Sequence, residues 1–461
     1  MQKFKLKERL MQSPTRVISL SFILVIVMGS LLLSLPISNA DDSCGYLNHL
    51  FIATSATCVT GLVPIVPCQQ YTIFGQIIIL CLIQIGGLGF LTFMTMFFIF
   101  AKKRLSFSNR LVMQEALNKN DLNDLNHFIM RIIRYTFTCE FLGACLLATQ
   151  FVREFGWIKG VYFSIFHSIS AFCNAGFDLL GSTSLIAYNQ NVLVSLTICT
   201  LIILGGIGFV VMFEIRDKFI HYLTNRESLS KIIRTFSLHT KLVLLMTISL
   251  ITLGTLVVFI FEKDNMATLG TMNMSNKVLN SFFQSITYRT AGFASIDQGA
   301  LTDISKLMGC LFMIIGGSPA GTAGGIKTAT LAVILITVHS VMKGRNTSIA
   351  FGRKIPFEVV MRSLAIILIS CTIVSLACLG LCLLEDFPMI DLFFEAFSAF
   401  GTVGLSANLT PLLGYGSKLI LICLMFVGRI GPITMILTFM KKVRGNKENQ
   451  VVYPNGDIIV G

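Results

Sequence analysis

The sequence has 461 residues, of which 54% are hydrophobic and only 13% are charged. A soluble domain carries about 25% charged residues, so this composition excludes an ordinary soluble enzyme and a disordered chain. The net charge of +13 is spread too thinly over an apolar chain for a nucleic-acid binder, and it is more typical of membrane topology. The composition therefore predicts an integral membrane protein surrounded by lipid, with no nucleic-acid partner.

Apolar runs of about 20 residues, the length that crosses a bilayer, recur along the whole chain. The first of them follows a basic N-terminal segment and is too long for a typical signal-peptide core. We therefore expect eight membrane helices, at about 17–37, 71–101, 132–152, 190–213, 242–261, 306–341, 363–384 and 417–440.

The spans form four pairs, and a shorter segment rich in Gly, Ser and Thr lies between the two spans of each pair. These segments align on one glycine at spacings of 115, 116 and 112 residues, with a phenylalanine ten residues before each glycine. A fixed period of this kind indicates structural repeats. The aligned residues are Phe51 and Gly61, Phe166 and Gly176, Phe282 and Gly292, and Phe394 and Gly404, and each second span carries a further glycine at Gly86, Gly205, Gly316 or Gly428.

The distribution of basic residues gives the orientation of these pairs. The termini and the linkers after the second, fourth and sixth spans hold 27 of the 36 Lys and Arg, the opposite side holds six, and Arg289, Lys327 and Arg429 lie at membrane depth. By the positive-inside rule both termini are cytoplasmic, in a multi-pass protein of the cell membrane. Every pair then has the same orientation, so the repeats are parallel rather than inverted.

The predicted fold class is therefore an all-α integral membrane protein of four tandem parallel helix–pore loop–helix repeats, eight transmembrane helices in all, around one central ion path. Non-helical backbone at membrane depth is tolerated where it lines water or is buried in protein, and rings of backbone carbonyls form cation filters. Outer acidic residues, among them Asp178, Asp297 and Glu395, would concentrate cations at the entrance. The predicted units are residues 13–111, 127–220, 235–345 and 356–445, followed by a cytoplasmic tail at 446–461.

The four glycine segments resemble the four pore loops of the Trk/Ktr/HKT superfamily of potassium transporters, and the run Gly324-Gly325-Ile326-Lys327-Thr328 resembles a fifth motif of the same superfamily. With no extra N-terminal pair of spans, the chain resembles the membrane subunit of a Ktr-type system more than the longer Trk-type subunit, which stays an alternative. The filter residues implied are Thr57, Cys58, Val59, Thr60 and Gly61; Cys173, Asn174, Ala175 and Gly176; Arg289, Thr290, Ala291 and Gly292; and Gly401, Thr402, Val403 and Gly404.

The resemblance also implies what the protein carries and what it binds. It implies uptake of potassium, held as substrate at the filter backbone, with sodium as an activator or cotransported ion and no organic cofactor in this chain. It further implies a homodimer with one pore per protomer, seated on a cytosolic ring of nucleotide-binding RCK/KTN-type regulatory subunits. Only one glycine recurs per loop, which predicts weaker discrimination between potassium and sodium than a longer carbonyl ladder gives.

The sixth span is too long and too broken to be one helix. Residues 302–342 would extend roughly 60 Å as a helix, about twice the hydrocarbon thickness. Five glycines and a proline lie within ten residues at its centre, which predicts two half-helices joined by an irregular gating loop at 316–325. The gate residues expected are Gly316, Gly317, Ser318, Gly321, Thr322, Gly324, Gly325, Lys327 and Arg429.

Four polar residues at membrane depth have different expected roles. Arg429 would lie beside the gating loop and raise a positive barrier in the cation path, because a central arginine requires a polar cavity. Lys327 would either cap loop carbonyls or reach the cytoplasm. Arg289 is expected to be a strut that bonds backbone carbonyls behind the filter. Glu140 would be a sodium or proton site, or would be hydrogen-bonded to Thr136, Thr138 or a neighbouring helix.

Other function classes fit the sequence less well. An intramembrane protease motif such as HExxH is missing from the sequence, and Ile326 interrupts the resemblance of residues 321–328 to a phosphate-binding loop. A secondary carrier of another solute would favour inverted repeats. The 13 cysteines contain no CxxC pair, which gives no support to zinc or redox sites, and a disulfide among Cys44, Cys58 and Cys68 stays open. We therefore expect an ion transporter and not an enzyme.

Overall fold

The structure is a computed structural model, and the residues it describes are 14–41, 44–89, 125–225, 234–345 and 347–439. Several expectations fall outside these residues. They concern the basic segment before residue 14, the second half of the span at 71–101, the linker that follows it, and the tail at 446–461.

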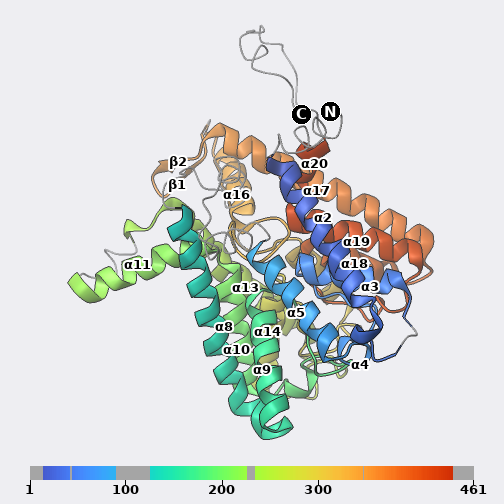
Figure 1. Cartoon of the computed structure of the whole chain (residues 1–461). Coiled ribbons are helices and arrows are strands. Elements are labelled where there is room, and N and C mark those ends of the chain that lie inside the picture. The colour runs from blue at the N-terminus through green and yellow to red at the C-terminus, as the bar shows by residue number, and fades with distance from the viewer. Residues whose placement is uncertain (1–13, 42–43, 90–124, 226–233, 346, 440–461) are drawn as a thin grey trace, which may run out of the picture.

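The described chain is mostly helical, with irregular loops between the helices and one small hairpin of β1 (Ile349–Ala350) and β2 (Arg353–Lys354) (Figure 1). Among the described residues, four helices are long and apolar enough to cross a membrane unbroken, and they fall in the first span of each predicted pair. These helices are α2 (Pro14–Leu33), α8 (Leu125–Phe155), α13 (Leu238–Glu262) and α17 (Phe357–Leu384).

The second helix of each pair is shorter and ends at a backbone break. The bent pair α10 and α11 changes direction by 102°, next to Gly208 with its φ of +94°. Gly431, with a φ of +95°, separates α19 from α20. The elements are α5 (Ile73–Leu88), α10 (Val192–Gly206), α11 (Phe209–Asn225), α15 (Asp303–Met313), α16 (Thr328–Met342), α19 (Tyr415–Ile430) and α20 (Pro432–Phe439).

These breaks correct two sequence predictions. The spans expected over 190–213 and 417–440 are not continuous helices, since α10 ends at Gly206 and α19 ends at Ile430. Gly208 and Gly431 follow these ends, and each has a positive φ that a continuing α-helix does not allow. The break expected in the sixth span is confirmed, since α15 and α16 are separated by irregular backbone at 314–327. The count of eight membrane helices stays a prediction.

Between the paired helices lie short helices, each followed by irregular backbone that includes an aligned glycine. They are α3 (Tyr46–Cys58), α9 (Trp157–Phe172), α14 (Met274–Thr287) and α18 (Met389–Gly401). The remaining short pieces are η1 (Pro36–Ser38), α4 (Pro67–Gln70) and η2 (Ile186–Tyr188).

The second and third pairs pack their short helices in matching ways. In one, the Ser168 hydroxyl donates to the carbonyl of Glu140 at 2.6 Å, and in the other, the Ser285 hydroxyl donates to the carbonyl of Ile251 at 2.8 Å. A glycine three residues further along the long helix, Gly143 or Gly254, gives each serine room. The two contacts are alike although the serines are offset by one residue in the glycine alignment, and the fourfold repeat stays a prediction.

Burial follows a pattern suited to lipid rather than water. Large apolar side chains are exposed along the long helices, as at Leu24, Phe141, Leu256 and Leu379. Several phenylalanines of the short helices are instead fully buried, among them Phe51, Phe166 and Phe394. Numerous hydroxyl groups also lie buried around the short helices. An apolar exterior around a polar interior is expected when lipid covers the outer face and the interior carries the functional groups.

Candidate functional site

The four glycine loops (57–61, 173–176, 289–292 and 401–404) share one backbone conformation. The residue two before each aligned glycine is left-handed, with φ of 57°, 60°, 66° and 52° at Val59, Asn174, Thr290 and Thr402. The aligned glycines themselves also have positive φ, of 100°, 68°, 80° and 94° in chain order. The same turn therefore follows each short helix. Glycine stands at each aligned position because it adopts a positive φ without a steric penalty.

The four loops close into a ring. A Cβ atom on Gly61 would lie 2.5 Å from the carbonyl oxygen of Ala175, and one on Gly176 would lie 2.7 Å from that of Ala291. On Gly292 it would lie 2.6 Å from the carbonyl oxygen of Val403, and on Gly404 it would overlap the carbonyl of Thr60. Each glycine therefore touches the next loop in order and the fourth returns to the first, with no room for a side chain at any of these positions.

Hydroxyl groups of the short helices tie the ring in place. The backbone N–H groups of Gly61 and Gly404 donate to Ser55 Oγ at 3.0 Å and Ser398 Oγ at 3.1 Å. In the other two loops, Ser170 Oγ donates to the carbonyl of Phe177 and Thr287 Oγ1 to that of Phe293, both at 2.7 Å. Sequence alignment places Ile286 opposite the serines and so misses Thr287, although the neighbouring hydroxyl was a visible signal.

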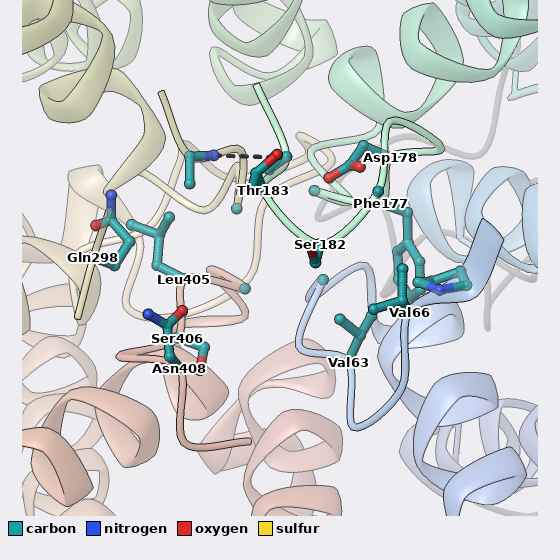
Figure 2. Close-up of a pocket in the computed structure, with 18 of the residues that line it drawn as sticks. Val63, Val66, Phe177, Asp178, Ser182, Thr183, Gln298, Leu405, Ser406 and Asn408 are labelled. Atoms are coloured by element: carbon teal, nitrogen blue, oxygen red, sulfur yellow. Dashed lines mark hydrogen bonds between the residues drawn. The ribbon is translucent and has the colours of Figure 1, made fainter. Parts of the chain in front are cut away.

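A cavity of about 440 Å³ opens on one side of the ring, with the four aligned glycines in its wall (Figure 2). Loops from four separate parts of the chain surround it, and Asn408 Nδ2 donates to Asp297 Oδ1 at 2.9 Å to join two of them. Asp178 and Asp297 line the cavity as expected of an acidic entrance. Glu395 does not, because it is fully buried against the hydroxyls of Ser406 and Thr410.

The segment 314–327 lies against the opposite side of the ring. A Cβ on Gly316 would lie 3.3 Å from the Thr290 side chain, and Gly324 packs against the Thr402 side chain. These contacts involve the residues before the aligned glycines, whereas the cavity is lined by the glycines and the residues after them. The segment therefore faces the cavity across the ring.

Backbone hydrogen bonds hold this segment to the ends of two helices. Ser318 N and Thr322 N donate to the carbonyls of Gly206 at 2.8 Å and Gly205 at 3.2 Å, at the end of α10. Gly325 N donates to the carbonyl of Gly428 in α19 at 3.2 Å. The segment is thus ordered by a small number of bonds to neighbouring helices rather than by helical structure of its own.

The expected position of Arg429 beside the loop is confirmed. Its Nη1 donates to the carbonyl of Thr322, and its Nη2 donates to those of Gly86 and, at 3.3 Å, Gly87 at the end of α5. Of the two alternatives for Lys327, the structure has the capping one, since Lys327 Nζ donates to the carbonyl of Ala323 at 2.6 Å. Two cations therefore lie at the segment and bond its carbonyls.

The aligned glycines of the second helices have different neighbours. Gly86, Gly205 and Gly428 pack directly on the carbonyls of Thr57, Phe172 and Phe400 at the ends of short helices, where a Cβ would overlap them. Gly316 faces the carbonyl of Gly324 within its own segment instead. The third copy departs from the sequence alignment here, because its second helix has ended at Met313.

Arg289 does not form the expected strut. Its side chain is buried and its Nε has no hydrogen-bond partner. The part of the chain that the structure describes contains no hydrogen bond from this guanidinium to a carbonyl behind the ring. The side chain is enclosed by packing between parts of the chain that a local motif does not reveal.

Glu140 bonds a neighbouring helix rather than a threonine of its own helix. Gln84 Nε2 on α5 donates to Glu140 Oε1 at 3.0 Å, while Glu140 Oε2 and Thr136 Oγ1 are buried without partners. Cys173 of the second glycine loop lies close by, with its Sγ 3.9 Å from Glu140 Oε1.

All 13 cysteines lie within the described residues and all are free, so no disulfide joins Cys44, Cys58 and Cys68 in this structure.

Comparisons with known proteins agree with this geometry. The model of a family described as cation transport protein, TrkH, matches residues 2–450. A solved structure, the potassium transporter TrkH from Vibrio parahaemolyticus, superposes with a TM-score of 0.70 over 91% of this chain and 84% of that chain. It is 16% identical in sequence and therefore supports the fold alone.

Curated relatives are closer in sequence. The Ktr system potassium uptake protein B of Bacillus subtilis is 39% identical, with both chains covered completely. The potassium/sodium uptake protein NtpJ of Enterococcus hirae is 38% identical over 100% of this chain and 99% of its own, and the Ktr system potassium uptake protein B of Vibrio alginolyticus is 35% identical over 97% and 94%. The chain belongs to the TrkH family of cation transport proteins, which are transporters and not enzymes.

Proposed function

We propose that this chain is the membrane subunit of a Ktr-type potassium uptake system whose transport depends on sodium. The closed ring of four glycine loops carries the proposal, because it brings backbone carbonyls from four parts of the chain to one place without any side chain between them. Two relatives carry the words potassium uptake in their names, and a third carries potassium/sodium uptake. This function follows from the chemistry of the ring together with these names.

In this proposal, the ring is the selectivity filter. Carbonyl oxygens of residues 57–61, 173–176, 289–292 and 401–404 replace the hydration shell of potassium, and the ring admits only glycine at its four closest contacts. The cavity with Asp178 and Asp297 in its wall collects cations in front of it. Because one glycine recurs per loop, sodium is discriminated less strongly than by a longer ladder of carbonyls.

The segment 316–325 acts as the gate below this filter. It lies directly against Thr290 and Thr402 of the ring, on the side away from the cavity. Arg429 and Lys327 bond its carbonyls and place positive charge there, which opposes the passage of a cation. Movement of the segment, together with the release of these bonds, opens the path.

The wider assembly follows the same interpretation. Residues 13–111, 127–220, 235–345 and 356–445 are four parallel units with eight membrane helices in total, and the termini, including the tail at 446–461, are cytoplasmic. Two chains form a homodimer seated on a cytosolic ring of nucleotide-binding subunits. The words Ktr system in the relatives' names support the part of this proposal that concerns partner subunits. The excess of basic residues on the predicted cytoplasmic side supports the orientation.

The test is rescue of a potassium-uptake-deficient bacterium at submillimolar potassium, with and without sodium, together with rubidium uptake by the same cells. The wild-type chain, co-expressed with its cytosolic partner, is expected to restore growth and uptake, and to do so better with sodium. Gly404→Ala is expected to abolish uptake, because the added Cβ overlaps the carbonyl of Thr60.

Gly344→Ala is the matched control. Gly344 also has a positive φ, of +69°, but a Cβ there meets nothing within 4 Å. If the correctly inserted wild-type chain fails to take up rubidium, the transport proposal is wrong. If Gly404→Ala and Gly344→Ala transport equally well, the ring is not the filter.

A further inference from the structure

A basic pocket of about 360 Å³ lies away from the ring, where α8 meets α11. Five of its six lining residues are on α8, at spacings that place them along one side of that helix, and the sixth is Arg216 on α11. The basic pocket is lined by His127, Arg131, Arg134, Tyr135, Thr138 and Arg216.

The pocket carries more positive than negative charge. Arg131 is held by two hydrogen bonds to Asp217, at 2.8 and 3.0 Å, and its guanidinium stacks over the Phe213 ring. Arg216 Nη2 reaches the same carboxylate at 3.0 Å. Arg134 is exposed and makes no ion pair with any residue that the structure describes. Two arginines therefore share the Asp217 carboxylate while Arg134 adds a third positive charge, and Arg131 Nε is buried without a hydrogen-bond partner.

Apolar surfaces lie on both sides of this positive charge. Beyond the pocket, on the membrane-spanning part of α8, Phe137, Phe141 and Leu142 are 50%, 68% and 57% exposed. On the other side, α11 turns away from the helical bundle (Figure 1) and exposes Phe219 and Leu223. Basic residues at the end of a membrane helix, continuous with an exposed apolar surface, form the pattern of an interface with anionic lipid.

We propose that the basic pocket binds the phosphate headgroup of an anionic phospholipid, whose acyl chains lie along the exposed apolar side of α8. A free phosphate ion would use the arginines but not the apolar side chains, whereas a phospholipid uses both. Arg134 and Arg216 supply the accessible charge, while Arg131 is fixed by Asp217 and holds the two helices together.

The experiment compares lipid retention by the full-length chain, purified in detergent and offered phosphatidylglycerol or phosphatidylcholine. The test variant is Arg134→Gln/Arg216→Gln, and Arg134→Lys/Arg216→Lys retains both charges. Since each basic residue near an anionic surface contributes about 1 kcal/mol, the glutamine variant is expected to bind phosphatidylglycerol about tenfold or more weakly. Phosphatidylcholine retention is expected to be unchanged, and the lysine variant is expected to bind like the wild type.

Arg353→Gln/Lys354→Gln in the exposed hairpin is the matched control, because it removes two charges outside the pocket. Equal retention of phosphatidylglycerol by the glutamine variant, its control and the wild type would overturn the proposal. Displacement of the lipid by inorganic phosphate alone would identify a free-anion site instead. Unchanged lipid binding with loss of a cytosolic partner would identify a protein contact.

Discussion

At the scale of single residues, Arg429 joins three parts of the chain that are far apart in sequence. Its guanidinium bonds the segment at Thr322 and the end of α5 at Gly86 and Gly87. An arginine near the centre of a membrane helix is unfavourable by about 2.5–3.5 kcal/mol on insertion scales, so its carbonyl partners matter for stability as well as for function. Arg429 therefore both fixes the segment and places positive charge beside it.

We predict that Arg429→Gln and Arg429→Ala raise the rate of rubidium uptake severalfold, because both remove the charge and loosen the segment. Initial uptake rates and apparent affinity for rubidium measure the effect. Arg362→Gln is the control, since Arg362 is an exposed arginine on α17. Unchanged uptake rates and rubidium affinity in both Arg429 variants would contradict the proposal that Arg429 opposes the passage of cations.

Glu140 gives a second prediction at this scale. Its hydrogen bond from Gln84 links α8 to the end of α5, close to Cys173 of the second glycine loop. Glu140→Gln keeps an oxygen that accepts this bond, whereas Glu140→Ala leaves the partly buried amide of Gln84 without its partner, and a buried donor left unsatisfied destabilises by about 1–3 kcal/mol. We expect the midpoint temperature of thermal unfolding of the purified protein to be lower in Glu140→Ala and little changed in Glu140→Gln.

The same pair of variants separates the two interpretations of Glu140. If the carboxylate only bonds Gln84, the glutamine variant retains the stimulation of uptake by sodium. Loss of that stimulation in Glu140→Gln, with stability intact, would instead assign the carboxylate to a cation or proton site.

At the scale of elements, the segment 314–327 is held by few side-chain bonds. Ser318 Oγ and Thr328 Oγ1 are 3.0 Å apart and connect the segment to the start of α16. One such bond contributes about 0.5–1.5 kcal/mol, and Ser318→Ala leaves the backbone bonds in place. We predict that this variant shifts the gate toward the open state and raises rubidium flux by roughly two- to tenfold.

The control for this prediction is Thr337→Val, which removes two side-chain bonds outside the segment, one to the carbonyl of Val333 within α16 and one to Ser348 Oγ. The preference for potassium over sodium is expected to be unchanged in both variants, because the ring is not altered. A changed ion preference without a changed rate in Ser318→Ala would place Ser318 in the filter rather than in the gate.

The elements also differ in how far the sequence reveals them. The four loops and the broken sixth span were predictable, because glycine and proline mark backbone that no ordinary helix adopts. The bend at Gly208 was not predictable, because its neighbours are apolar and glycine also occurs inside packed membrane helices. The bond between Gln84 and Glu140 joins residues 56 apart in the chain, and only the packing of α5 on α8 brings them together.

At the scale of the whole molecule, the first and last described helices meet. Arg16 Nε donates to the carbonyl of Thr438 at 2.9 Å, and Ser19 Oγ lies 3.1 Å from Thr438 Oγ1. The beginning of α2 and the end of α20 therefore lie at the same end of the molecule. Together with the ring, in which the fourth loop returns to the first, this contact closes the chain around one centre.

This closure makes the proposed orientation testable with fusions at several points. The positive-inside rule places the C-terminus and the loop at Gly344 in the cytoplasm, and the turn at Asp264 outside, because 27 basic residues lie on one side and six on the other. Fusions of alkaline phosphatase, which is active outside the cytoplasm, are expected to be active only after Asp264. Fusions of green fluorescent protein are expected to fluoresce after Gly344 and at the C-terminus. The reverse pattern would invert the pore, and the cavity with Asp178 and Asp297 would then face the cytoplasm rather than the source of potassium.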